Sequence, residues 1–102
     1  MSFLNLLTKQ ININDGVSAF RKTPDAVLLD VRTPEEYAEG HIPGSKNLPL
    51  NRLPALSAKK DTPLFVYCYS GARSRRACAW LNQNGYMTTD IGGIMNYRGA
   101  ME

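Results

Sequence analysis

The apolar residues of this chain fall into short runs that alternate with segments typical of helices. Residues 26–29 (Ala-Val-Leu-Leu) and 64–67 (Leu-Phe-Val-Tyr) are apolar without alternation. Because strands covered on both faces are apolar at successive positions, these two runs predict the centre of a parallel sheet. Weaker strand-like patterns lie at residues 11–13, 46–48 and 86–89.

Helix signals lie between these runs. Thr33 is placed as an N-cap, Pro34 suits the first helical position, and Glu36 completes a capping box with Thr33. Gly40 is expected to end this helix in the left-handed conformation. Further helical segments are expected at residues 16–22 after an N-cap at Asn14 or Asp15, at 74–81 before Asn84-Gly85, and as short turns at 50–56 and 94–97.

The alternation of strands and helices predicts an α/β fold with a mostly parallel sheet. In sheets of this kind, ligands collect at the carboxyl ends of the strands. Asp30-Val31-Arg32 follows the first apolar run, and Cys68 follows the second. We therefore expect these residues to share one edge of the sheet.

Cys68 is the first candidate for chemistry. It precedes a short glycine-containing turn, Tyr69-Ser70-Gly71, which leads into the helix expected at residues 74–81. Unpaired amides at a helix start can point at such a position, and the helix dipole favours negative charge there. Because the thiolate rather than the thiol is the nucleophile, these surroundings predict a reactive cysteine.

Three arginines at the start of that helix oppose its dipole. Arg73, Arg75 and Arg76 lie where each exposed cation costs about 0.3–1 kcal/mol. A bound anion would relieve this conflict, and local violations of this kind are expected at functional sites. The alternative for Arg75 and Arg76 is that they simply point into water. Arg73 is the better candidate for an anion contact.

Composition and charge limit the remaining possibilities. The 102 residues carry a formal net charge of +3, with 43% hydrophobic and 21% charged residues, which suits a single globular domain over residues 1–102. The charge is too small and scattered to indicate a nucleic-acid partner. Residues 1–7 lack the features of a signal peptide, and no apolar run has membrane-spanning length. Two cysteines make no disulfide framework, so a cytoplasmic location is expected.

Two separated motifs resemble a known family. Residues 28–37 (LLDVRTPEEY) and 40–48 (GHIPGSKNL) resemble the first signature of rhodanese domains. Residues 66–74 (VYCYSGARS) are similar to their active-site loop, and Gly92-Gly93 matches a late glycine pair. The resemblance spans residues 11–97. It implies a rhodanese-like α/β fold, with a five-stranded, mostly parallel central sheet flanked by helices on both faces.

The resemblance also implies a sulfurtransferase. Cys68 would carry sulfane sulfur as a persulfide, from a donor such as thiosulfate to a thiophilic acceptor, either cyanide or a thiol. Loop amides would form a nest for the sulfur anion, the Ser70 and Ser74 hydroxyls would add hydrogen bonds, and Arg73 would hold an anionic donor bidentately. The expected substrate-binding residues are Tyr69, which would wall the pocket, Ser70, Gly71, Ala72, Arg73 and Ser74.

Other reactive or polar residues are expected to be structural. Cys78 lies among apolar helix neighbours and is expected to pack in the core, with a resolving thiol as the alternative. His41, the only histidine, is expected to be structural in its turn. Asp30 and Arg32 are expected to tie the loop edge by hydrogen bonds and an ion pair, with orientation or charge balance of the site as the alternative. One histidine and two cysteines in no ligand spacing predict no metal and no cofactor.

Four other functions stay as alternatives. Phosphatases, including those with the rhodanese fold, have five residues between their cysteine and arginine, whereas this chain has four between Cys68 and Arg73. The shorter loop makes a smaller cradle for an anion, which is better matched to one sulfur than to a phosphoryl group. This argument also disfavours an arsenate reductase. A docking module without activity is less expected, because inactive members of the family commonly lack the cysteine, whereas this chain has both Cys68 and Arg73. A persulfide carrier serving a thioredoxin-like or other sulfur-relay protein would have the same loop chemistry.

Overall fold

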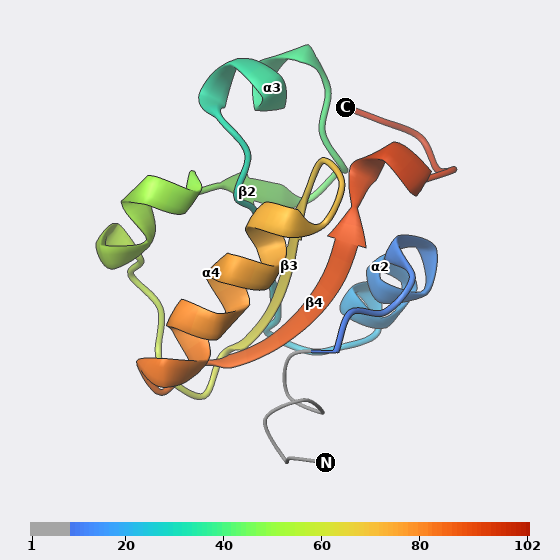
Figure 1. The fold of residues 1–102 in the computed structure, drawn as a ribbon. Coiled ribbons are helices and arrows are strands. Elements are labelled where there is room, and N and C mark those ends of the chain that lie inside the picture. The colour runs from blue at the N-terminus through green and yellow to red at the C-terminus, as the bar shows by residue number, and fades with distance from the viewer. Residues whose placement is uncertain (1–8) are drawn as a thin grey trace.

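The computed structural model describes residues 9–102, so the expectation about residues 1–7 lies outside the described part of the chain. Four parallel strands form one sheet in the order β2-β1-β3-β4 (Figure 1). The elements are α2 (Ile13–Arg21), β1 (Val27–Asp30), α3 (Pro34–Glu39), β2 (Ser45–Asn47), the 3₁₀ turn η1 (Leu50–Ala55), β3 (Pro63–Cys68), α4 (Ala72–Gln83), β4 (Met87–Gly93) and the 3₁₀ turn η2 (Ile94–Asn96). The predicted α/β class is confirmed.

The expectation of five strands is wrong for residues 9–102, whose sheet has four. The strand expected at residues 11–13 is reduced to a single parallel bridge between Gln10 and Asp90. Pairing stops there because the chain turns at once into α2, where the Asn12 side chain accepts a hydrogen bond from the Asn14 amide at 2.8 Å. The N-cap is therefore Asn12, rather than Asn14 or Asp15.

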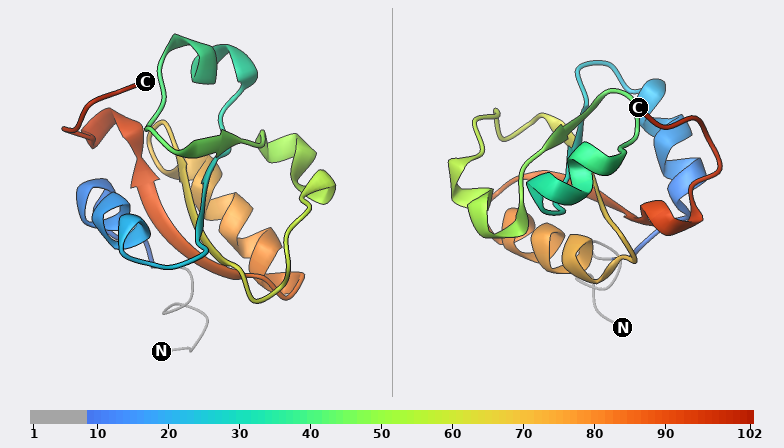
Figure 2. Two further views of the ribbon diagram at one scale, coloured as in Figure 1. Left: turned by 180° about the vertical axis from the view of Figure 1, so that it is seen from behind. Right: turned by 90° about the horizontal axis from the view of Figure 1, so that it is seen from above.

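The sheet has a helix on each face, as Figure 2 shows in its view from above. Along β3, Leu64, Val66 and Cys68 belong to the cluster that contains the buried side of α4. Phe65 and Tyr67 belong to the cluster on the α2 side. This alternation places both faces of β3 in the core, which explains the continuous apolar run from which the strand was predicted.

The end of β4 and the conformation of Gly40 differ from the prediction. Strand β4 extends to Gly93 instead of ending at residue 89, and Gly93 is at the same time the N-cap of the last turn, η2. Gly40 ends α3 as expected, but with φ 154° and ψ 136° rather than in the left-handed helical conformation. The capping box of Thr33 and Glu36 is confirmed, with both of its hydrogen bonds present.

The carboxyl ends of the strands meet at the edge below α3 (Figure 1). Asp30 pairs with Tyr67 in the parallel register of β1 and β3, so Asp30 and Cys68 lie at the same edge, as predicted. The turn into α4 leaves from this edge. No helix within residues 9–102 has the length and apolar character needed to cross a membrane.

Candidate active site

Cys68 ends β3 and its sulfur lies at the N-terminus of α4. The Gly71 amide donates to Sγ at 3.0 Å and the Ser74 amide donates to it at 3.3 Å. Gly71 is the N-cap with φ 106°, a left-handed conformation that residues with a Cβ rarely adopt. Two of the loop amides thus form the nest expected for the sulfur. Cys68 itself is only 1% exposed.

A buried carboxyl group braces this loop. The Ser74 hydroxyl donates to Asp90 Oδ1 at 2.8 Å, and the Gly92 amide donates to the same oxygen at 3.1 Å. The Ser74 hydroxyl was expected to donate a hydrogen bond to the sulfur, but in the structure it donates to Asp90, and the backbone amide of Ser74 donates to Sγ instead. Asp90 is 1% exposed, and burial raises the pKa of its carboxyl group.

Two other segments hold the same loop from outside α4. The Gln10 side-chain amide donates to the Gly71 carbonyl, and the Met95 amide donates to the Tyr69 carbonyl at 3.1 Å. At Gly93 a Cβ atom would lie 2.2 Å from the Tyr69 carbonyl oxygen. Because only glycine permits this approach, β4 can pack directly against the turn that carries Cys68.

Arg73 is paired with Glu36 across the strand ends. Its two terminal nitrogens donate to the two oxygens of Glu36 at 2.6 and 3.0 Å, which links α3 to the first turn of α4. The hydrogen bonds from Arg73 lower the pKa of Glu36 to about 2, helped by the capping bond from the Thr33 amide. Glu36 thus serves both as a capping residue and as the counter-ion of Arg73.

The remaining loop residues face outward. Tyr69 is 49% exposed and lines a hollow of about 320 Å³ together with Arg32, Glu36 and Ile94. Ser70 and Ala72 are exposed. The roles expected for Tyr69, Ser70 and Ala72 as substrate contacts, and for Arg73 as an anion clamp, stay predictions.

The residues expected to be structural are placed accordingly. Arg32 and Asp30 form a buried bidentate ion pair, with a shortest distance of 2.6 Å, and Arg32 also donates to the Gly40 carbonyl. His41 stacks on the Tyr37 ring, and its Nδ1 lies 2.9 Å from the Tyr37 carbonyl oxygen. These contacts fix the two loops beside the strand ends.

Cys78 differs from Cys68 in its surroundings. It is fully buried in the cluster under α4, and burial raises the pKa of its thiol to about 12. Both cysteines are free. The prediction that Cys78 packs in the core is confirmed. Within residues 9–102, no group of three or more His, Cys, Asp or Glu side chains is arranged to hold a metal ion.

Comparison with known proteins identifies the family. The model of the rhodanese-like domain matches residues 14–102, so the chain belongs to this family. A sulfurtransferase of Allochromatium vinosum is 43% identical over 81 residues, which are 78% of this chain and 71% of that protein. The thiosulfate sulfurtransferase GlpE of Stutzerimonas stutzeri is 43% identical over 63 residues, 60% of this chain and 58% of that protein. A rhodanese-like domain protein from Staphylococcus aureus superposes with a TM-score of 0.81 at 28% identity, covering 92% of this chain and 96% of that one.

Sequence reasoning missed two partners of the loop. Glu36 was assigned only to the capping box, although a partly buried carboxylate beside a strand end is also a natural counter-ion for Arg73. Asp90 was not singled out at all. Its signal was a charged residue directly before the apolar Ile91 and the glycine pair, a position that here is 1% exposed.

The Glu36–Arg73 pair predicts a pH-dependent stability. Glu36→Gln keeps an oxygen for the capping box and removes the charge. Because the folded-state pKa of Glu36 is below its ordinary 4.5, the pair stabilises the wild type above pH 4.5, and this advantage disappears as the pH falls toward 2. We expect Glu36→Gln to lower the free energy of unfolding by only ~1 kcal/mol at neutral pH, because both side chains are about one-third exposed and water screens the pair. Urea unfolding at a series of pH values measures it.

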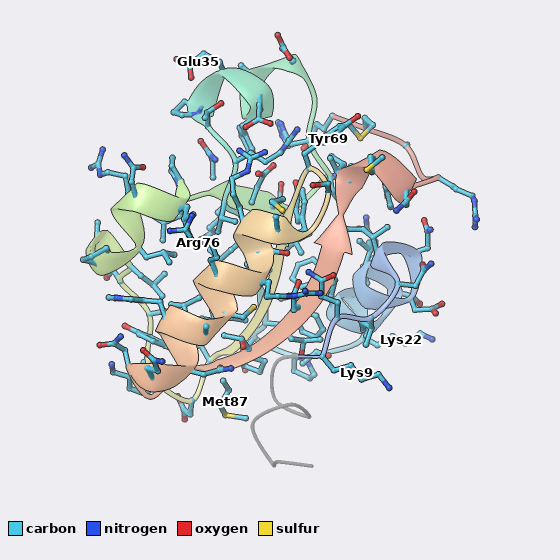
Figure 3. The ribbon with its side chains drawn as sticks, in the orientation of Figure 1. Lys9, Lys22, Glu35, Tyr69, Arg76 and Met87 are labelled. Carbon is cyan, nitrogen blue, oxygen red and sulfur yellow. The ribbon has the colours of Figure 1, made fainter. Side chains whose placement is uncertain are left out.

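Glu35→Gln is the matched control for that experiment. Glu35 lies next in sequence on the same helix, and Figure 3 shows it at the outer side of α3. It forms no ion pair within residues 9–102, so its replacement should change stability by less than ~0.5 kcal/mol at any of these pH values. A Glu36→Gln effect that is independent of pH would show that the ion pair does not stabilise the fold.

Proposed function

We propose that this chain is a sulfurtransferase that moves sulfane sulfur from a donor such as thiosulfate to a thiophilic acceptor, through a persulfide on Cys68. The observation that supports this most strongly is the pair of amides from Gly71 and Ser74 directed at Sγ. Fixed donors of this kind stabilise an anion without needing to reorganise during the reaction. Family membership and relatives that carry the name sulfurtransferase support the same assignment.

The reaction proceeds in two displacement steps. The Cys68 thiolate attacks the outer sulfur of thiosulfate, the sulfur–sulfur bond of the donor breaks, and sulfite leaves with the electron pair. The resulting Cys68 persulfide is then attacked at its outer sulfur by cyanide or a thiolate, which restores the Cys68 thiolate. Both steps are balanced without an added oxidant or reductant, and the loop amides face an anionic sulfur throughout.

Arg73 is the proposed contact for the anionic donor. In the structure its guanidinium group holds the Glu36 carboxylate bidentately, which is the geometry that an oxyanion such as the sulfonate end of thiosulfate also accepts. We propose that the donor exchanges with Glu36 at Arg73 and thereby reaches the otherwise buried Cys68. Glu36 then returns to Arg73 after sulfite has left.

The same chemistry also suits a persulfide carrier. In that version a thioredoxin-like or other sulfur-relay protein supplies or accepts the sulfur, while Cys68 and its loop act as described. A reducing cytoplasm is the compartment we propose for either version, because an unoxidised Cys68 thiolate is required and an exposed persulfide would be lost to oxidation elsewhere.

Intact-protein mass spectrometry tests the persulfide. After exposure to thiosulfate and removal of the excess, the wild type should gain the mass of one sulfur atom, and cyanide or a dithiol should remove it. Cys68→Ala should gain nothing. Cys78→Ala is the matched control, and it should load as the wild type does because Cys78 is buried in the core. The proposal would be contradicted if Cys68→Ala gained as much sulfur as the wild type, or if the wild type gained no sulfur.

The role of Arg73 predicts a dependence on donor charge. Arg73→Ala should lower kcat/KM for loading from thiosulfate by about tenfold or more, the effect of one lost charged hydrogen bond. Loading from a neutral organic polysulfide should fall far less. Arg75→Ala, an exposed arginine two positions further along α4, is the control and should alter neither rate. Equal losses with both donors would rule out Arg73 as the anion contact.

A further inference from the structure

A groove beside the active-site loop has no role in the function proposed so far. It has a volume of about 510 Å³ and lies between η1 and the first turns of α4, where Figure 3 shows Arg76. Its walls are mainly apolar, and two cations stand at the α4 side. The apolar residues that matter here are Val31, Leu50, Leu53, Pro54 and Trp80, and the cations are Arg73 and Arg76.

The charge of this groove is one-sided. Its lining residues include two arginines and no acidic residue. Arg73 is paired with Glu36, whereas Arg76 is exposed and forms no ion pair within the part of the chain that the structure describes. An apolar cavity with an unpaired cation at its rim suits a molecule that has an apolar body and an anionic group.

The size of the groove argues against the small donor as its occupant. Cavities of roughly 300–1,000 Å³ accommodate organic ligands of several rings or a comparable chain, and thiosulfate is far smaller than that. Thiosulfate would contact Arg73 alone and leave the apolar walls covered only by water. The groove therefore suits the second substrate better than the first.

The groove lies close to the Cys68 loop, although the buried Cys68 does not itself line it. Val31 lines it and packs in the same buried cluster as Cys68. The Val31 amide donates to the carbonyl of Tyr67, the residue before Cys68, at 3.0 Å. Arg73 is shared between the groove and the Cys68 loop. A ligand seated on these walls would thus have one end at the loop.

We propose that this groove binds the sulfur acceptor, and that the acceptor is a small amphipathic thiol with an aromatic or aliphatic body and a carboxylate or phosphate group held by Arg76. This inference rests on the proposed sulfurtransferase function. The acceptor thiol loses its proton to water, and its sulfur attacks the outer sulfur of the Cys68 persulfide. The sulfur–sulfur bond of the persulfide breaks, the Cys68 thiolate leaves with the electron pair, and the acceptor departs as a persulfide.

The test uses protein that has already been loaded with sulfur and freed of donor, so that only the acceptor step is measured. Mercaptophenylacetate is the amphipathic probe, mercaptobenzyl alcohol has the ring without the charge, and mercaptoacetate has the charge without the ring. The rate at which the added sulfur mass is lost, measured over a range of thiol concentrations, gives KM for each thiol. Because thiols differ in intrinsic nucleophilicity, KM rather than kcat is compared, and each variant is compared with the wild type.

Mercaptophenylacetate should have a KM at least about tenfold below that of mercaptobenzyl alcohol, since one charged hydrogen bond is worth this much. Its KM should also be at least about tenfold below that of mercaptoacetate, because burial of the ring against the apolar walls is worth a similar free energy. Arg76→Gln should remove its advantage over mercaptobenzyl alcohol, and Leu50→Ser should reduce its advantage over mercaptoacetate. Arg75→Gln, the neighbouring exposed arginine outside the groove lining, is the control and should preserve both advantages.

Binding without reaction provides a second measurement. Trp80 is the only tryptophan of the chain and lines the groove, so its fluorescence reports occupancy. In Cys68→Ala, titration with mercaptophenylacetate should change this fluorescence and give a dissociation constant. Arg76→Gln in the same background should raise that dissociation constant about tenfold.

The outcomes separate this inference from the proposed function. Failure of the wild type to load sulfur would overturn the proposed function itself. Normal loading followed by equal KM values for the three thiols, or by an advantage that survives Arg76→Gln, would overturn only the acceptor site. If reduced thioredoxin discharged the persulfide at far lower concentration than every small thiol, and did so through Arg76, the groove would be a protein-docking surface and the small-thiol proposal would be wrong.

Discussion

The contact on which the rest of the site depends is the pair of backbone amides that point at the sulfur of Cys68. Cys68 is 1% exposed, so its sulfur has little access to water and its hydrogen bonds come from the protein. The Gly71 and Ser74 amides supply them because the chain leaves β3 through a turn short enough to start α4 beside the same residue. The direction of these backbone amides is set by the path of the chain, and the surrounding residues fix that path.

The path of this turn is maintained by contacts from distant parts of the sequence. Asp90 accepts hydrogen bonds from Ser74 and Gly92, which ties the first turn of α4 to the end of β4. A buried carboxyl group is expensive, and here one of its oxygens, Oδ2, has no hydrogen-bond partner within residues 9–102. Tolerance of that cost is expected where a polar contact specifies geometry that apolar packing would leave loose. The absence of a side chain at Gly93 completes the arrangement, because β4 then packs against the Tyr69 carbonyl.

The parts of the structure that local sequence determines were predictable. The capping box at Thr33 and Glu36, the two continuous apolar strands and the cysteine at a strand end all follow from residues close together in the chain. Contacts between distant residues were not. The pairing of Glu36 with Arg73 joins residues 37 positions apart, and the bond from Ser74 to Asp90 depends on where β4 ends. The fifth strand was expected from the family pattern, but the N-cap at Asn12 turns the chain into α2 after a single bridge.

The most direct test of the account follows the two amides themselves. Two-dimensional amide NMR spectra of the protein, recorded before and after loading with sulfane sulfur from thiosulfate, report the hydrogen bonds to Sγ. The account predicts that the Gly71 and Ser74 amide resonances shift more than those of any other residue in the loop or α4, and that they return when cyanide removes the sulfur. Formation of the Cys68 persulfide with both resonances unmoved would contradict the claim that these amides hold the reacting sulfur.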